Sequence, residues 1–242
     1  MNKEFEEKNA EMIAQMNQDK ALRRLSDDWL KATVPYQYTY HFTWMGRPII
    51  QLPQDIIAVQ ELIWRVKPKW IVETGVAHGG SLVFLASMME LIGNGGHVVG
   101  IDIDIRMHNR AAIEAHPMAK RIDLIQGSSI DEAIVRQVRD RVREGPVMVI
   151  LDSNHTHEHV LRELQMYSPL VTKGSYLLVM DTAVEDLPKD FFPDRPWGPG
   201  DNPKTAVREF LAANRRFEVD REPENKLLLT VAPEGFLKCI AD

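Results

Sequence analysis

Short, mostly apolar segments alternate with helical segments along most of the chain, and this alternation limits the fold more than any other sequence feature. Continuous apolar strands are typical of a parallel sheet with both faces covered, because helices then shield each face from water. Five such strands are expected at residues 70–73, 97–102, 122–126, 147–151 and 176–180.

Segments with helical periodicity precede and separate these strands. Right-handed crossovers place such helices on both faces of the sheet and make it doubly wound. The sequence therefore predicts an α/β fold with a doubly wound, mostly parallel seven-stranded sheet of the Rossmann-like kind. The expected helices cover 55–65, 81–91, 131–143, 158–167 and 203–214, and two late strands are expected at 217–219 and 227–231.

The first 53 residues differ from the rest of the chain. Residues 1–31 set apolar side chains at helical spacing among charged ones, which predicts a helix. Residues 33–53 are rich in aromatic residues and interrupted by prolines, which is typical of irregular structure packed over another part of the molecule. We therefore expect an N-terminal helix and aromatic arm over 1–53, acting as a cap or a dimer contact, and a ligand-binding catalytic domain over 54–242. The apolar stripe on the N-terminal helix predicts a homo-oligomer.

Composition excludes several classes of partner. With 29 basic and 35 acidic residues, the net charge of −6 provides no basic excess for binding nucleic acid. No apolar run approaches the ~20 residues of a membrane span, and the first residues do not form a signal peptide. A lone cysteine, Cys239, rules out an internal disulfide, which suits a reducing compartment. These features predict a soluble cytoplasmic protein.

A glycine-rich turn, residues 73–81, follows the first strand of the alternating region and leads into a helix. Ligands of doubly wound sheets bind at the carboxyl ends of the strands, and Gly75 and Gly79 let the backbone approach a ligand there. The dinucleotide-binding pattern fails because Ala77 replaces its second glycine, and no lysine of the phosphate-loop type follows. Glu73 would repel a pyrophosphate but would pair with a cationic ligand.

A second acidic residue, Asp102, ends the strand at 97–102. In folds of this kind a carboxylate at that place accepts hydrogen bonds from the ribose hydroxyls of a nucleoside. Together with Glu73, it predicts a site for a cationic amino-acid nucleoside, S-adenosylmethionine. The alternative is a generic tight turn beside a solvated aspartate.

These residues carry a family resemblance. The pattern Glu-x-Gly-x-x-x-Gly-x-Ser, formed by Glu73, Gly75, Gly79 and Ser81, resembles the first motif of class I methyltransferases of the catechol O-methyltransferase type. Over roughly residues 35 to 235, the chain resembles the cephalosporin hydroxylase family of S-adenosylmethionine-dependent proteins. The matching segments are the end of the arm at 44–53, ETGVAHGGSL, VVGIDID, LDSNH and the strand that ends in Met180-Asp181.

The resemblance implies a Rossmann-like class I O-methyltransferase that methylates a hydroxyl of a sugar, a lipid or an antibiotic. Ser128 and Ser129, after the strand at 122–126, lie where such folds line the adenine. Asp152 is assigned to the cofactor site as well as to a metal. The other cofactor residues carried over by position are Glu73, Gly75, Gly79, Ser81 and Asp102.

Two acids end neighbouring strands and predict a metal site. Asp152 and Asp181 follow the strands at 147–151 and 176–180, and two converging carboxylates repel unless a cation or a proton separates them. Mg²⁺ prefers such oxygen ligands, and the resemblance implies Mg²⁺ at these strand ends. The resemblance also implies a Glu-Asp pair where this chain has Met180-Asp181, so the metal is weaker, completed by water or Asn154, or absent. Replacing Met180 by Glu is expected to tighten it.

The histidines after Asp152 allow three interpretations. His155 is the expected general base, because it follows a strand end and a neutral imidazole suits proton removal near pH 7. Read literally, His155, Glu158 and His159 match the H-x-x-E-H pattern of zinc peptidases, although that pattern normally lies within a helix. The third interpretation is a set of solvated histidines without a role.

The residues therefore predict an S-adenosylmethionine-dependent O-methyltransferase, with Mg²⁺ at Asp152 and Asp181 and His155 as base. One alternative is an oxygen-dependent hydroxylase that holds iron through Asp152, His155 and His159. Another is a non-catalytic S-adenosylmethionine-binding partner subunit, which Met180 favours. Acceptor specificity is expected in the arm at 36–44 and in the Pro/Gly-rich loop at 191–202.

Overall fold

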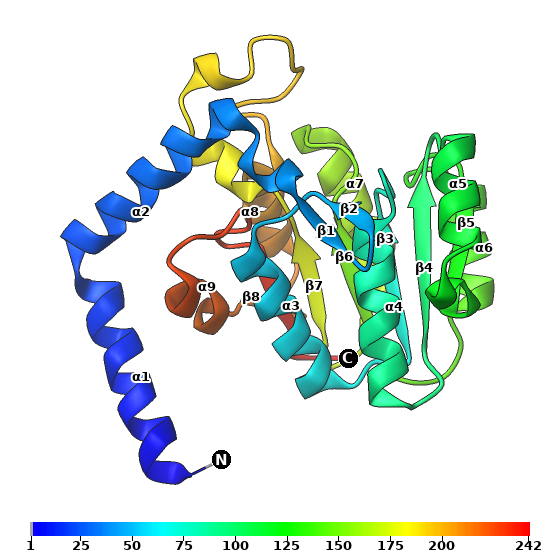
Figure 1. Ribbon diagram of the computed structural model, residues 1–242, viewed down its shortest axis with the longest axis horizontal. Helices are drawn as coiled ribbons and strands as arrows, with labels where there is room; N and C mark the ends of the chain where they lie inside the picture. Colours follow the sequence, from blue (N-terminus) through cyan, green and yellow to red (C-terminus); the bar gives the residue numbers. More distant parts are fainter. Residues whose placement is uncertain (1) are drawn as a thin grey trace.

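A seven-stranded sheet forms the centre of the molecule in the computed structural model, which describes residues 2–242 (Figure 1). The strand order is β5-β4-β3-β6-β7-β9-β8, and every pair from β5 to β7 is parallel, whereas β9 runs antiparallel to both β7 and β8. The predicted α/β fold, with its doubly wound and mostly parallel sheet, is confirmed. The strands are β3 (Trp70–Thr74), β4 (His97–Asp102), β5 (Ile122–Gln126), β6 (Val147–Leu151), β7 (Tyr176–Val179), β8 (Phe217–Val219) and β9 (Phe236–Cys239).

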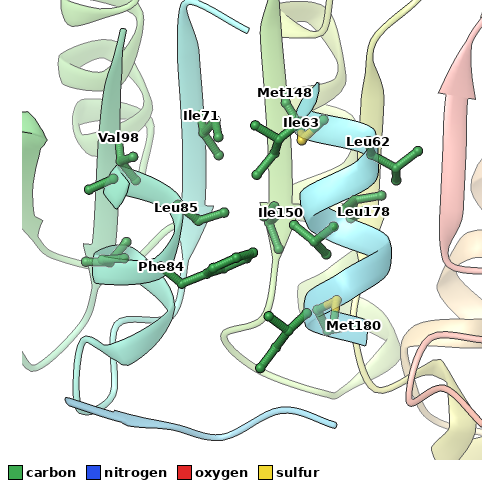
Figure 2. Packing of buried hydrophobic residues seen from close by; sticks show 14 of the residues in the cluster. Leu62, Ile63, Ile71, Phe84, Leu85, Val98, Met148, Ile150, Leu178 and Met180 are labelled. Atoms are coloured by element: carbon green, nitrogen blue, oxygen red, sulfur yellow. The ribbon is translucent and has the colours of Figure 1, made fainter. Parts of the chain in front are cut away.

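Helices cover both faces of this sheet because alternate strand residues point to opposite sides. Ile71 of β3 belongs to a core cluster beneath α3 and α4, whereas its neighbour Val72 belongs to a second cluster beneath α6, α7 and α8. Figure 2 shows α3 and α4 packed over the strands of the first cluster. The helices are α3 (Pro53–Val66), α4 (Gly80–Ile92), α5 (Met107–Glu114), α6 (Glu132–Arg141), α7 (His157–Tyr167) and α8 (Pro203–Ala213).

The strand expected at 227–231 is wrong. Residues there end α9 (Arg221–Leu227) and continue as a loop, and the last strand of the sheet is β9 instead. The Asp220 side chain accepts a hydrogen bond from the Glu222 N–H, so a helix begins just before the apolar run. Asp55 then accepts a hydrogen bond from the Val231 N–H, which ties the loop to α3. Helix α5 is a further element that the sequence pattern did not indicate.

The N-terminal segment forms two helices rather than one. Asp19 separates α1 (Lys3–Gln18) from α2 (Lys20–Thr33), because its extended backbone ends the first helix and its side chain accepts hydrogen bonds from two N–H groups of the second. Figure 1 shows both helices as an arm that projects from one side of the sheet. Phe5, Met12 and Leu25 are exposed on this arm. Self-association through it, and the boundary at residue 53, stay predictions.

The aromatic part of the arm is more ordered than expected. Two short 3-10 turns (Val34–Tyr36 and Tyr38–His41) lead into a hairpin of β1 (Phe42–Trp44) and β2 (Arg47–Ile49). The Trp44 indole donates a hydrogen bond to the Ser87 hydroxyl of α4 and packs edge-on against Phe84. The hairpin therefore lies against the first turns of α4, next to the glycine turn. Within residues 2–242, no helix has the length and apolar character needed to cross a membrane.

Candidate active site

The glycine turn lies directly against the turn that follows β6. Gly75 has a φ of +93°, and a side chain at this position would put its Cβ 2.0 Å from the Asp152 carbonyl oxygen. Only glycine combines that backbone conformation with so close an approach. The segments after β3 and β6 are therefore held together at the carboxyl edge of the sheet, as the sequence predicted.

Two residues that the sequence analysis missed hold the turn in place. The Arg47 guanidinium, on β2, donates to the His78 carbonyl oxygen at 3.0 Å and to the Asn109 side-chain oxygen at 3.1 Å. Asn109, on α5, donates in turn to the Ala77 carbonyl oxygen at 2.9 Å. Arg47 lies in the family-like segment 44–53, but its role, like that of Asn109, depends on its position in the tertiary structure.

Glu73 is an unusual acid because it is only 1% exposed. One carboxylate oxygen accepts a hydrogen bond from the Ser81 hydroxyl at 2.5 Å, and the other, Oε2, is buried without a partner in the described chain. Burial raises the pKa of Glu73 to about 8. A cation next to Oε2 would stabilise the ionised carboxylate, so this group suits a positively charged ligand.

Asp102 lies at the end of β4, beside the glycine turn, as predicted. Its Oδ2 accepts hydrogen bonds from the Val76 N–H at 2.8 Å and the Ala77 N–H at 3.2 Å, and its Oδ1 accepts one from the Asp104 N–H at 3.0 Å. A carboxylate accepts about four hydrogen bonds, so these backbone contacts occupy most of its capacity. Asp102 therefore also shapes the turn, a role that the sequence analysis did not anticipate.

A pocket of about 50 Å³ lies between the hairpin and the glycine turn. Asp152 contributes to its wall, so the pocket reaches the end of β6. The lining residues most relevant to a ligand are Gln51, Glu73, Gly75, Ser81 and Asp152.

Next to this pocket, three titratable side chains converge. The Nε2 atom of His155 lies 3.4 Å from Oδ2 of Asp181 and 3.9 Å from Oδ1 of Asp152. Asp181 follows β7 and has a left-handed backbone with a φ of +54°, which places it at the start of a new turn. Burial, and next the charge of Asp181, raise the pKa of Asp152 well above its ordinary value.

This cluster fits a hard cation. One ligand atom from each of Asp152, His155 and Asp181 can be chosen so that all three lie within 4.8 Å of one another. The two carboxylates are an acceptable donor set for a divalent ion that keeps several waters, as Mg²⁺ does, and the imidazole of His155 lies beside them. Between such close acids, a cation would relieve the repulsion that otherwise keeps a proton on Asp152.

The side chain of Met180 lies in the core, away from the metal site that the sequence predicted. It is 3% exposed and belongs to the core cluster beneath α3, where Figure 2 shows it among apolar side chains. A glutamate at this position would bury a carboxylate in that cluster instead of extending the metal site, because the side chain lies on the core side of the chain. The expected gain from replacing Met180 by Glu is therefore withdrawn.

Aromatic side chains lie over His155. The Trp197 ring stacks on the imidazole with centroids 5.0 Å apart and an interplanar angle of 33°. The Phe192 ring also packs against Trp197, with centroids 4.7 Å apart, and Arg195 lies over the same indole. The Pro/Gly-rich loop, expected to carry acceptor specificity, thus contacts His155.

The C-terminal end of this loop is anchored. Glu185 accepts hydrogen bonds from the Gly200 N–H and the Asn202 side chain, and Asn202 caps α8. Asp201 accepts a hydrogen bond from the His157 N–H at the start of α7. Trp197 therefore lies in a loop whose C-terminal end is fixed.

The other two histidines of this segment, His157 and His159, contact other parts of the molecule. His157 contacts the Thr205 hydroxyl and the Glu209 carboxylate on α8. His159 lies 3.0 Å from the Ser129 hydroxyl and 3.5 Å from the buried Glu163. His155 and His159 do not converge, which removes the geometric basis for a zinc-peptidase site and for the proposed iron site.

The serines after β5 differ from each other. Ser129 is buried, and its hydroxyl is engaged by His159. Ser128 is partly exposed beside it. Their assignment to the adenine stays a prediction.

Comparison with known proteins gives consistent matches. Residues 36–240 match the family model described as Rhamnosyl O-methyltransferase/CmcI. The rhamnosyl O-methyltransferase of Mycobacterium tuberculosis is 32% identical over 200 residues, which cover 81% of this chain and 77% of that protein. The protein of the same name from Mycobacterium leprae is also 32% identical, over 81% of this chain and 82% of its own length.

Solved structures share the fold at lower identity. A CmcI structure with Mg and SAM has a TM-score of 0.57 and 22% identity over 84% of this chain and 78% of that one. An O-methyltransferase from Bacillus cereus in complex with SAH has a TM-score of 0.53 and 16% identity over 80% and 81%. These structures support the Rossmann-like arrangement of the sheet and its helices.

Proposed function

The chain belongs to the Rhamnosyl O-methyltransferase/CmcI family, and from this we propose that it transfers a methyl group from S-adenosylmethionine to a hydroxyl of a sugar-bearing small molecule. The main observation in support of this proposal is that one residue, Asp152, belongs to two neighbouring sites. Asp152 lines the pocket that contains Glu73 and is also part of the cluster with His155 and Asp181. A methyl donor and a hydroxyl group would therefore meet at the end of β6.

The residues around the pocket suit the cofactor. S-adenosylmethionine carries an ammonium group, and Glu73 lines the pocket and has a buried carboxylate oxygen without a partner in the described chain. Asp102 would accept the ribose hydroxyls by giving up part of its contacts with the turn. Sites for ligands of this size are about 300 Å³ or larger, so the cofactor would extend beyond this pocket toward Asp102, which contacts the lining residues Val76 and Ala77.

Asp152 and Asp181, with water, would hold Mg²⁺ and leave the imidazole of His155 uncoordinated. Bound there, the ion would lower the pKa of an acceptor hydroxyl and fix it near the methyl group. Methyl transfer is an in-line displacement, so the contribution of the protein is mainly proximity and orientation.

His155 is the proposed general base. Its Nε2 atom would take the hydroxyl proton, and the neighbouring Asp181 and Asp152 carboxylates would stabilise the imidazolium that forms. Its Nδ1 atom is buried without a hydrogen-bond partner in the described chain, so Nε2 is the nitrogen that meets the acids. Proton removal at this atom matches the position of the imidazole next to the pocket.

The acceptor is proposed to be a sugar because an aromatic surface lies above the base. Trp197 stacks on His155, and its partner Phe192 extends that surface. Flat apolar faces with a few well-placed polar groups are typical of small-molecule sites. A pyranose ring that displaces His155 from the indole would place a hydroxyl beside Asp152 and Asp181.

The direct test is methyl transfer to a rhamnoside. The protein is incubated with S-adenosylmethionine, Mg²⁺ and a panel of phenyl rhamnosides, and the products are analysed by mass spectrometry. The proposal expects one methyl group on the sugar and one S-adenosylhomocysteine released for each turnover. Gain of an oxygen atom, or unchanged rhamnosides across the panel, would contradict the proposed reaction.

A further inference from the structure

Gln51 is a buried polar side chain without an evident structural role. It lies between β2 and α3 and is 4% exposed. Its Oε1 atom is buried and has no hydrogen-bond partner in the described chain. Leaving an amide oxygen unsatisfied costs on the order of 1–3 kcal/mol, so such an atom calls for an explanation.

The backbone around Gln51 is fixed close to the glycine turn. A side chain at Gly80 would put its Cβ 2.0 Å from the Pro48 carbonyl oxygen, so the end of the hairpin lies against the first turn of α4. On either side of Gln51, Ile49 and Leu52 are each 1% exposed and anchored in the core. Pro53 then begins α3. Gln51 is thus held where its side chain reaches the pocket.

The pocket that Gln51 lines also contains Glu73, whose Oε2 atom is unpaired as well. Two residues with buried acceptor oxygens that lack donors therefore line one cavity, one from the hairpin side and one from the glycine turn. Among the described residues, no Lys or Arg side chain lines this pocket. A ligand that brings several N–H donors and a positive charge would satisfy both oxygens.

We propose that Gln51 binds the methionyl end of S-adenosylmethionine, accepting a hydrogen bond from its ammonium group through Oε1 while Glu73 accepts another. The amide nitrogen of the same side chain is a donor suited to the methionyl carboxylate. This inference rests on the proposed function, because it assumes the cofactor. It adds the hairpin of the N-terminal arm to the cofactor site, so the arm takes part in ligand binding.

Gln54 provides a matched comparison within the same chain. Its Oε1 atom is also buried and unpartnered, but Gln54 lies in α3 and does not line the pocket. An unsatisfied oxygen alone would make the two glutamines equivalent. Only Gln51 combines that oxygen with a place in the pocket wall, which is why the proposal distinguishes them.

The test compares two ligands that differ in the methionyl end. S-adenosylhomocysteine carries the amino-acid group, whereas 5′-methylthioadenosine lacks it. Binding of each is measured by calorimetry for the wild type, Gln51→Met and Gln54→Met, because methionine keeps the volume of glutamine and removes its polar atoms. We expect Gln51→Met to weaken S-adenosylhomocysteine about 5- to 100-fold and to leave 5′-methylthioadenosine unchanged. Gln54→Met should change neither affinity.

Equal loss of affinity for both ligands in Gln51→Met would mean that the side chain only supports the fold, and no loss for either would remove it from the site. Both results overturn the inference. If Gln51→Met does not fold, Gln51→Ala replaces it, with the melting temperature as the check. A wild type that binds neither ligand would instead contradict the proposed function, and the inference would fall with it.

Discussion

The imidazole of His155 lies 3.4 Å from the carboxylate of Asp181, although the two residues follow different strands of the sheet. The turn after β6 and the turn after β7 therefore meet, and Asp152 completes the cluster at 3.9 Å. Asp152 also lines the pocket that contains Glu73, and Trp197 stacks on His155.

His155→Ala should lower the turnover number about 10²- to 10⁴-fold, which is the usual contribution of a positioned general base. Affinity for S-adenosylhomocysteine should stay the same, because His155 is not a residue of the cofactor pocket. Steady-state kinetics and calorimetry measure the two quantities. His157→Ala is the control, since His157 contacts Thr205 and Glu209 instead of the acids. Near-normal turnover in His155→Ala would place the base elsewhere.

Asp181→Asn should weaken Mg²⁺, because it removes one of two carboxylates that would hold the ion. The wild type should lose activity in EDTA and regain it when Mg²⁺ is added, and the variant should need more Mg²⁺ for half-maximal activity. Asp186→Asn, at an exposed acid paired with Lys204, is the control. Full wild-type activity in EDTA would argue for a metal-free mechanism.

Trp197→Ala should raise the KM for the acceptor while the affinity for S-adenosylhomocysteine is unchanged. The indole covers His155 from a loop that does not line the cofactor pocket. Trp197→Phe should recover part of the loss, because it restores an aromatic face. A variant whose acceptor KM equals that of the wild type would remove Trp197 from the acceptor site.

The buried Asp55 should make the free energy of unfolding depend on pH. Burial raises its pKa from 3.8 to about 7, so its protonated form is favoured in the folded state. An acid whose pKa is higher in the folded than in the unfolded state stabilises the fold fully at pH values below its unfolded pKa. This contribution is lost as the pH rises to about 7. Asp55→Asn cannot ionise and should keep an acceptor for the Val231 N–H.

The free energy of unfolding, measured with urea at pH 5 and pH 8, should therefore fall more in the wild type than in Asp55→Asn. The difference between the two proteins should be on the order of 3 kcal/mol. Other titrating groups affect both proteins alike and cancel in this comparison. Identical pH dependence would show that Asp55 does not titrate in the folded protein across this range.

The central sheet was predictable because its strands are short apolar runs that differ clearly from the helices between them. The strands at 97–102, 122–126 and 147–151 have the predicted bounds. The strand expected at 227–231 failed because its apolar residues cover the core from a loop, and local hydrophobicity does not reveal whether a segment pairs with a neighbour. Helix α5 was missed because its short sequence carries a weak apolar stripe.

For the site, position at a strand end was a reliable guide. Asp152, His155 and Asp181 were each identified from such positions, and the structure brings them together. Arg47, Asn109 and Gln51 were not identified, because their roles depend on how the hairpin and α5 pack against the glycine turn. The effect of Met180 on the metal site was predicted wrongly, because sequence does not show which way a side chain points just after a strand ends. Met180 points into the core.

Calorimetric titration with S-adenosylhomocysteine tests the central claim, that the carboxyl edge of this sheet binds the methyl donor. The wild type should bind this ligand and should not bind NAD, and its melting temperature should rise with ligand concentration. Asp102→Ala should bind about 1–3 kcal/mol more weakly, because the ribose loses its acceptor. Absence of S-adenosylhomocysteine binding to the wild type, or binding of NAD in its place, would contradict the account.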